Sequence, residues 1–127
     1  MSGMPTPEQM VAVVQAYVAA FAAGDVDAVV ALFAEDATVE DPVGTPPKRG
    51  LAEIRAFYAG SMATGARLEL LGDPRCAADY VAFPFAVKLE WQGSRQVIEV
   101  IDTFRLDASG KITEMRAFFG PANMKSA

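Results

Sequence analysis

The sequence predicts an α+β fold, with three helices in the first half of the chain and an antiparallel sheet in the second half. Apolar residues in the first half recur every three or four positions, which is the spacing of one helix face. In the second half, long runs alternate apolar and polar residues, as strands do when one face is buried. The length of 127 residues fits one domain with one core, and there is no internal repeat or linker.

The helices are predicted from their start and stop signals. Thr6 and Pro7 open the first helix, because threonine caps a helix and proline favours its first turn, and Gly24 ends it. Its apolar stripe consists of Met10, Val14, Tyr17, Val18 and Phe21. A short second helix, capped by Asp25, follows. Its apolar positions are Val26, Val29, Val30 and Phe33. The third helix is predicted over residues 51–61, after a loop rich in proline and glycine.

The strands are predicted from alternation and from turn residues. They cover residues 37–41, 67–71, 77–91, 95–106 and 111–119. Tight turns at Gln92-Gly93 and at residues 107–110 join the last three strands, which therefore form an antiparallel meander.

The composition narrows the possible functions. The chain contains no histidine, which excludes every mechanism built on an imidazole base and most catalytic zinc sites. Its net charge is −5 and its lysines and arginines are scattered, whereas binding of nucleic acid needs a basic face. Proton chemistry therefore has to come from carboxylates, tyrosines, lysines or the one thiol, Cys76.

The apolar content predicts a ligand cavity, a subunit interface or both. Hydrophobic residues make up 52% of the chain, which is more than the core of an ordinary soluble domain needs. No apolar run approaches the roughly 18 residues that span a bilayer, and residues 1–7 lack the features of a secretory signal. A lone cysteine fits a reducing compartment. We therefore expect a cytoplasmic protein that does not bind membranes.

Asp102 stands alone among apolar residues on one face of a predicted strand. Side chains alternate between the two faces of a strand, and the other residues on this face are Ile98, Val100, Phe104 and Leu106. A buried carboxyl group without a partner tends to bind a proton, and it can then donate a hydrogen bond. The alternative is that Asp102 ends a turn or pairs with an arginine from another element.

Asp41 ends the predicted strand 37–41 and has the same orientation as Ala37 and Val39. It precedes Pro42, where the strand gives way to a long loop, and such strand ends often carry catalytic groups. The alternative is an aspartate that only begins the loop.

Two tyrosines are also predicted to point inward. Tyr17 lies at the centre of the first helix's apolar stripe, so its buried hydroxyl needs a partner, and Tyr58 on the inward face of the third helix could supply one. Two inward acids and two inward tyrosines exceed what packing of a small core requires.

Several segments resemble bacterial ketosteroid isomerases (steroid delta-isomerases), which belong to the nuclear transport factor-like superfamily. The clearest are Val-Glu-Asp-Pro at residues 39–42 and, about sixty residues later, Ile-Asp at 101–102. The likeness covers nearly the whole chain. It implies that residues 1–127 form a single ketosteroid isomerase-like domain, a cone in which three helices pack on a curved, mainly antiparallel sheet around an apolar pocket.

The resemblance also implies a role for each candidate residue. Asp41 matches the general base, while Tyr17 and a protonated Asp102 match the two donors to the substrate's ketone oxygen. Tyr58 matches the tyrosine that bonds to the donor phenol, and Phe33 stands where some members have one more tyrosine. The implied substrate is a 3-oxo-Δ5-steroid, isomerised to its Δ4 form without cofactor or metal, in a homodimer paired through the sheet. The implied pocket wall consists of Phe57, Phe85, Val87, Ile98, Val100, Met115 and Phe119.

Other functions share these features, because one fold hosts many activities. A polyketide cyclase could use an acid in an apolar pocket. An epoxide hydrolase would need an arginine between two inward acids, and Arg105 faces the opposite way from Asp102. A steroid or lipid carrier would explain the apolar residues but not an acid on each of two inward faces.

Overall fold

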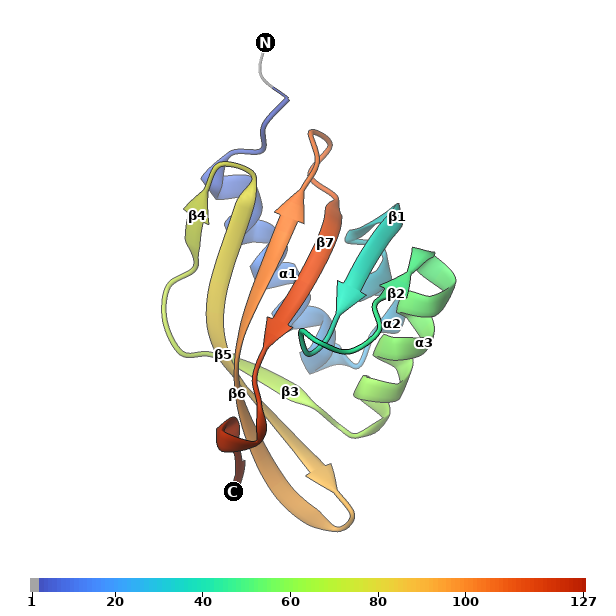
Figure 1. Ribbon diagram of the computed structural model, residues 1–127, viewed down its shortest axis with the longest axis vertical. Helices are drawn as coiled ribbons and strands as arrows, with labels where there is room; N and C mark the ends of the chain where they lie inside the picture. The colour runs from blue at the N-terminus through green and yellow to red at the C-terminus, as the bar shows by residue number, and fades with distance from the viewer. Residues whose placement is uncertain (1–2) are drawn as a thin grey trace.

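The structure, a computed structural model that describes residues 3–127, contains three α-helices packed on a curved sheet (Figure 1). The helices are α1 (Pro7–Ala23), α2 (Val26–Val30) and α3 (Gly50–Ala63), with a short 3₁₀ helix, η1 (Pro121–Asn123), near the C-terminus. The strands are β1 (Phe33–Glu40), β2 (Lys48–Arg49), β3 (Arg67–Leu70), β4 (Arg75–Ala77), β5 (Tyr80–Trp91), β6 (Ser94–Leu106), β7 (Ile112–Phe118) and β8 (Met124–Ser126).

The eight strands of this region form one mixed sheet. Its order is β2-β1-β7-β6-β5-β3, while β4 adds to β5 and β8 adds to β6. All neighbours are antiparallel except β1 and β7, which are parallel. In Figure 1, α1 lies behind β5, β6 and β7, and α3 lies beside β1 and β2. The predicted α+β fold is confirmed.

The helix boundaries follow the predicted caps. The Thr6 hydroxyl accepts the backbone N–H of Gln9 at 3.1 Å, and the Gln9 side chain accepts the N–H of Thr6 at 2.8 Å. These two bonds satisfy donors that the first turn of a helix leaves free. Gly24 then ends α1 in the left-handed conformation, at a φ of 63°, and Asp25 caps α2 by accepting the N–H of Ala28.

Two predictions about the elements were wrong, and an edge strand was missed. Phe33 begins β1 instead of ending the second helix. The long strand predicted over 77–91 is a hairpin of β4 and β5, because the chain turns at Ala78 with a φ of 54°. The backbone carbonyl of Asp79 stabilises that turn by accepting the N–H of Leu106 at 3.0 Å. The edge strand β8 was not predicted.

The core lies between α1 and the upper half of the sheet. Met10 and Val14 of α1 are fully buried, as are Phe83 of β5 and Phe104 of β6. The alternation predicted for these two strands is therefore confirmed. The β5–β6 hairpin extends past α1 (Figure 1). Residues of this part of the sheet line a cavity instead of a packed core. No helix of residues 3–127 is long and apolar enough to cross a membrane.

Candidate active site

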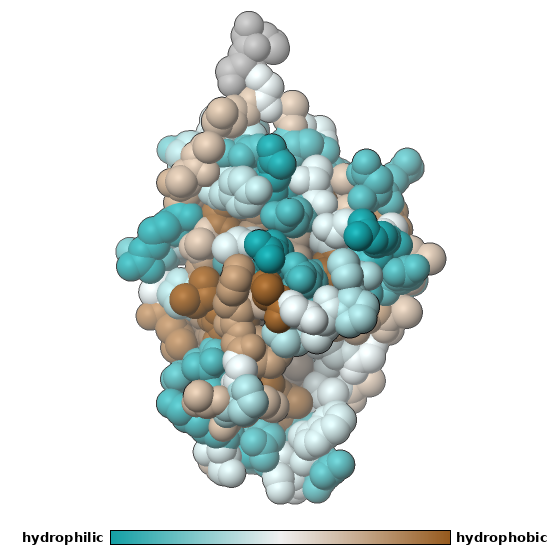
Figure 2. All heavy atoms as spheres, viewed as in Figure 1, coloured by the Kyte–Doolittle hydropathy of each residue, from teal (hydrophilic) through white to brown (hydrophobic). Residues whose placement is uncertain are grey.

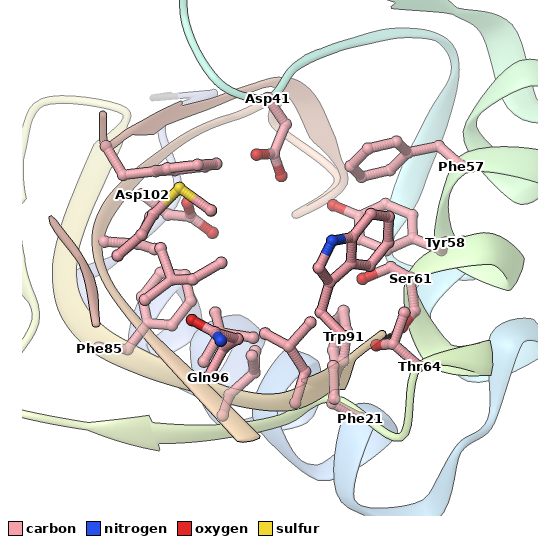
Figure 3. A pocket seen from close by; sticks show the side chains of 18 of the residues that line it. Phe21, Asp41, Phe57, Tyr58, Ser61, Thr64, Phe85, Trp91, Gln96 and Asp102 are labelled. Carbon is pink, nitrogen blue, oxygen red and sulfur yellow. Dashed lines mark hydrogen bonds between the residues drawn. The ribbon is translucent and has the colours of Figure 1, made fainter. Parts of the chain in front are cut away.

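A cavity of about 520 Å³ opens between the sheet, α1 and α3. This volume is within the range of small-molecule sites. Its closed end carries two carboxyl groups and two phenols, and most of the remaining wall is apolar (Figure 3). The wall consists of Tyr17, Phe21, Asp41, Phe57, Tyr58, Ser61, Thr64, Ala66, Leu68, Phe85, Val87, Leu89, Trp91, Gln96, Ile98, Val100, Asp102, Phe119 and Met124.

Strand β7 brings the two acids to the same cavity. Ala117 of β7 is paired with Asp102 on β6, and its carbonyl accepts the N–H of Val43 at 2.8 Å in the loop after β1. Glu40, the last residue of β1, also pairs with β7 and accepts a hydrogen bond at 3.0 Å from an arginine there. Asp41 lies between these two anchored residues. The parallel contact between β1 and β7 therefore sets the position of Asp41 relative to Asp102.

Asp102 is a buried acid without a partner. Its side chain is 1% exposed, and neither carboxyl oxygen makes a hydrogen bond within residues 3–127. Burial, with a smaller contribution from the charge of Asp41, raises the pKa of Asp102 well above its ordinary range. Burial therefore favours the neutral, protonated form of this carboxyl group, and in that form it can donate a hydrogen bond into the cavity. The pairing with an arginine, considered from the sequence alone, does not occur.

Asp41 faces the same cavity from the end of β1 (Figure 3). Burial raises its pKa from 3.8 to about 6, and the positive charge of Lys48 on β2 partly opposes that rise. Asp41 is thus mostly ionised at pH 7, whereas burial favours the protonated form of Asp102. Because its pKa is close to the working pH, this carboxylate can both accept a proton and release it.

Tyr17 and Tyr58 form a hydrogen-bonded pair beside the acids. Their hydroxyl oxygens are 3.0 Å apart, and burial raises the pKa of both phenols well above the ordinary value. A pair of neutral phenols that share one hydrogen bond has one further proton to donate to a ligand. The ring of Phe33 meets the ring of Tyr58 with centroids 5.7 Å apart. Because phenylalanine has no hydroxyl, Phe33 adds no further hydrogen bond to the pair of phenols.

The structure places six of the seven predicted wall residues on the cavity. These are Phe57, Phe85, Val87, Ile98, Val100 and Phe119. Met115 is the exception. It faces inward on β7 but is fully buried in the core, in register with Val39 on one side and Phe104 on the other. The interpretation of Met115 as a substrate-binding residue therefore needs correcting.

Sequence reasoning missed most of the cavity's outer part. Leu89, Trp91 and Gln96 share the strand face of residues already predicted, so alternation alone could have identified them. Ser61 lies one helical turn after Tyr58, so the spacing of the helix could also have identified it as a residue that faces the cavity. Met124 had no such signal, because it belongs to the unpredicted strand β8. No group of three or more acidic or cysteine side chains in residues 3–127 is placed to hold a metal ion.

Comparisons with known proteins show the family to which this chain belongs. The family model of the SnoaL-like domain matches residues 14–115. The chain is 42% identical over 113 residues to a steroid Delta-isomerase from Nocardioides simplex. The aligned residues cover 89% of this chain and 91% of that protein. It is 35% identical over 104 residues to the epoxide hydrolase LasB from Streptomyces lasalocidi, covering 77% of this chain but 36% of that protein.

A solved structure shows the same fold. It is that of SalBIII, an epoxide hydrolase/cyclase-like enzyme with a role in pyran ring formation in the polyether salinomycin. The two chains superpose with a TM-score of 0.89 at 30% identity, over 94% of this chain and 97% of that chain.

The matches define the class of this protein: the chain belongs to the SnoaL-like domain family, which has the nuclear transport factor-like fold. Its identity to the Nocardioides simplex protein over most of both chains makes it an enzyme related to the steroid Delta-isomerases. The resemblance found in the sequence is thereby confirmed.

Proposed function

We propose that this enzyme converts 3-oxo-Δ5-steroids to 3-oxo-Δ4-steroids. The observation that carries the proposal is the pair of acids in one apolar cavity, in which Asp102 is buried without a partner while Asp41 remains ionised at pH 7. Such a reaction needs an ionised acid that takes up and returns the proton. It also needs a neutral acid that donates a hydrogen bond to the oxygen that gains charge. The relationship to the Nocardioides simplex isomerase supports the same chemistry.

Asp41 carries the proton in this mechanism. Its carboxylate removes a proton from the carbon between the ketone and the double bond, and the electrons shift to give a dienolate. The same group, now protonated, returns the proton two carbons further along, and the conjugated ketone forms. One carboxylate is sufficient because it acts first as base and then as acid. The reaction as proposed uses no cofactor and no metal.

Tyr17 and Asp102 stabilise the dienolate oxygen. Both line the cavity, and both are neutral at pH 7, so each can donate a hydrogen bond to an oxygen that becomes negative. Such bonds are stronger in an apolar, dry site than in water. Tyr58 acts through Tyr17, because its hydroxyl bonds to that phenol at 3.0 Å. The apolar wall around them keeps out water and fits the rings of a steroid.

The proposal is tested by following the absorbance of the conjugated enone when a 3-oxo-Δ5-steroid is added. We expect turnover by the parent protein and almost none by Asp41→Asn, which cannot accept the proton but should still bind an apolar steroid. Asp36→Asn is the matched control, because Asp36 is exposed on β1, the strand that leads into Asp41. Near-normal turnover by Asp41→Asn would contradict the assigned base.

Epoxide opening is the second candidate function, since LasB and SalBIII are described as an epoxide hydrolase and an epoxide hydrolase/cyclase-like enzyme. A protonated acid opposite an ionised one could also open an epoxide. However, no arginine lines the cavity among residues 3–127, and Arg105 instead bonds to Asp79 at 3.0 Å. We therefore favour the isomerase. Consumption of a hydroxy-epoxide without any enone formation from a steroid would reverse that choice.

We also propose that the enzyme is a homodimer paired through the sheet. Ile101 and Phe118 are paired on the outer face of β6 and β7 and are 50% and 43% exposed. Figure 2 shows apolar surface gathered near the middle of the face that it presents. Exposed apolar patches of this kind are typical of interfaces. In sedimentation measurements Ile101→Lys should shift the protein to monomer, whereas Leu71→Lys, at an exposed leucine of another region, should not.

A further inference from the structure

Glu40 precedes the proposed base in the chain, yet the reaction proposed above does not use it. Neighbouring residues of an extended chain point to opposite faces of a sheet. Asp41 faces the cavity (Figure 3), whereas Glu40 faces outward and its side chain is 24% exposed. The side chain of Glu40 instead contacts the segments that surround Asp41.

The two oxygens of the Glu40 carboxyl bind two different segments. Oε1 accepts a hydrogen bond at 3.0 Å from the guanidinium Nε of Arg116, which is the register partner of Glu40 on β7. Oε2 accepts the backbone N–H of Gly44 at 3.2 Å, in the loop after β1. The side chain thus links this loop to β7, and Asp41 lies in the stretch of chain between Glu40 and Gly44.

Both contacts together need an ionised carboxylate at position 40. The hydrogen bond from Gly44, followed by that from Arg116, lowers the pKa of Glu40, so the group carries a charge at pH 7. An ionised carboxylate accepts on both oxygens, whereas the amide of glutamine has one acceptor oxygen. Glutamine at this position can therefore keep one of the two contacts, and alanine keeps neither.

The carboxyl of Asp41 has no hydrogen bond that holds it directly. Among residues 3–127 none involves this group, and none contributes to its pKa. Its position therefore depends on the backbone on either side. That backbone is tied to β7 twice, by the N–H of Val43 on the carbonyl of Ala117 at 2.8 Å and by the Glu40 carboxylate.

On the basis of the proposed function, we infer that Glu40 is a positioning residue, whose carboxylate ties the loop at Gly44 to Arg116 and so holds Asp41 where it can carry the proton. Glu40 touches no substrate in this role, because it lies on the outer face of the sheet. It acts through the base alone.

This role predicts a loss of rate without a loss of binding. The base has to reach two carbons of the substrate in turn, and a misplacement of about 1 Å can cost about a hundredfold in rate. The two donors to the oxygen, Tyr17 and Asp102, lie on α1 and β6, whereas Glu40 contacts β7 and the loop. A ligand held by these donors should therefore not sense a change at position 40.

The test measures turnover and binding separately in Glu40→Ala and Glu40→Gln. Turnover of a 3-oxo-Δ5-steroid is followed by the absorbance of the enone. Binding of an unreactive planar phenolic steroid, which imitates the dienolate, is followed by the fluorescence of Trp91, the one tryptophan of the chain, which lines the cavity. Asp79→Ala is the matched control. It breaks an ion pair to Arg105 that has the same N–O distance of 3.0 Å, and the Asp79 side chain is 26% exposed.

Glu40→Ala should lower kcat by about 10- to 100-fold, Glu40→Gln should lower it less, and Asp79→Ala should leave it unchanged. The dissociation constant of the phenol should be the same in all four proteins. An unchanged kcat in Glu40→Ala would overturn the inference, and so would an equal loss in Asp79→Ala. A phenol affinity that falls together with kcat would also overturn it, because Glu40 would then support the whole site. Absence of turnover by the parent would instead contradict the isomerase itself.

A second measurement of the same role needs no turnover. In the parent, Asp41→Asn should raise the urea midpoint at pH 8, because it removes a charge that burial disfavours. In Glu40→Ala the same substitution should raise the midpoint less, since a released loop lets the carboxylate turn toward water. The charge of Glu40 does not contribute to the raised pKa of Asp41, so the difference reports position. Equal rises in the two backgrounds would overturn the inference, whatever the substrate.

Discussion

Replacing Asp41 by asparagine should stabilise the folded protein at neutral pH, although it removes the proposed base. Burial raises the pKa of this carboxyl from 3.8 to about 6, despite the opposing charge of Lys48. At about 1.4 kcal/mol per pKa unit, the ionised group therefore lowers the free energy of unfolding by about 3 kcal/mol. Asparagine has nearly the same size and no charge, so most of this free energy should be recovered.

The size of the stabilisation by Asp41→Asn depends on pH in a defined way. Below about pH 3.8 the carboxyl is protonated in both the folded and the unfolded chain, so its raised pKa carries no penalty. As the pH rises from about 3.8 to about 6, the carboxyl ionises more readily in the unfolded chain than in the folded protein, and the stability of the parent falls. The variant and the parent should thus be nearly equally stable near the lower pH. The difference should grow between these two values and stay constant above them.

Urea unfolding at a series of pH values measures this difference directly. Asp36→Asn serves again as control, because it removes one carboxyl from an exposed position of β1. It should change the stability by less than about 0.5 kcal/mol at every pH. If Asp41→Asn is no more stable than the parent at pH 8, the carboxyl is not held in a desolvated site. The reasoning about its role as a proton carrier would then fail as well.

Four further predictions concern the rate of isomerisation. Tyr17→Phe should lower kcat by roughly a hundredfold or more, because one donor to the oxyanion is lost, and a loss of only a few-fold would make Tyr17 a core residue. Tyr58→Phe should cost less than Tyr17→Phe, since Tyr58 acts through the 3.0 Å bond to that phenol; an equal or larger loss would indicate direct contact with substrate. In the parent, kcat/KM should rise with pH up to about 6 and then level off, because the base must be ionised. Lys48→Met should move this limb to higher pH, since the lysine's charge lowers the pKa of the base, whereas Lys88→Met, which removes a lysine paired with Glu69 on the surface, should leave it in place.

Much of the fold, and the inward positions of the candidate residues, could be predicted from the sequence because they depend on local patterns. Asp102 is the clearest case, since the alternation of β6 alone placed it on the buried face. The caps at Thr6 and Gly24 likewise fixed the ends of α1. Asp41 was harder, because a strand end next to a proline is common, and its orientation depends on the parallel pairing of β1 with β7. That pairing joins distant segments and has no local signature.

The rest of the site depends on how the sheet curves. Met115 and Val100 both lie on inward faces, yet one is packed in the core and the other lines the cavity. Alternation gives the face of a residue but not its place along the cone, so the two could not be separated in advance. Gln96 and Ser61 were missed for a related reason, because they line one cavity only where the β5–β6 hairpin and α3 come together.

The central claim is that the two acids of the cavity have opposite protonation states at the same pH, and infrared spectroscopy tests it most directly. A protonated carboxylic acid shows a C=O stretching band that an ionised carboxylate lacks. At pH 8 the parent protein should show this band, Asp41→Asn should retain it, and Asp102→Asn should lose it. Absence of the band in the parent, or its persistence in Asp102→Asn, would contradict a neutral Asp102 as donor to the substrate's oxygen.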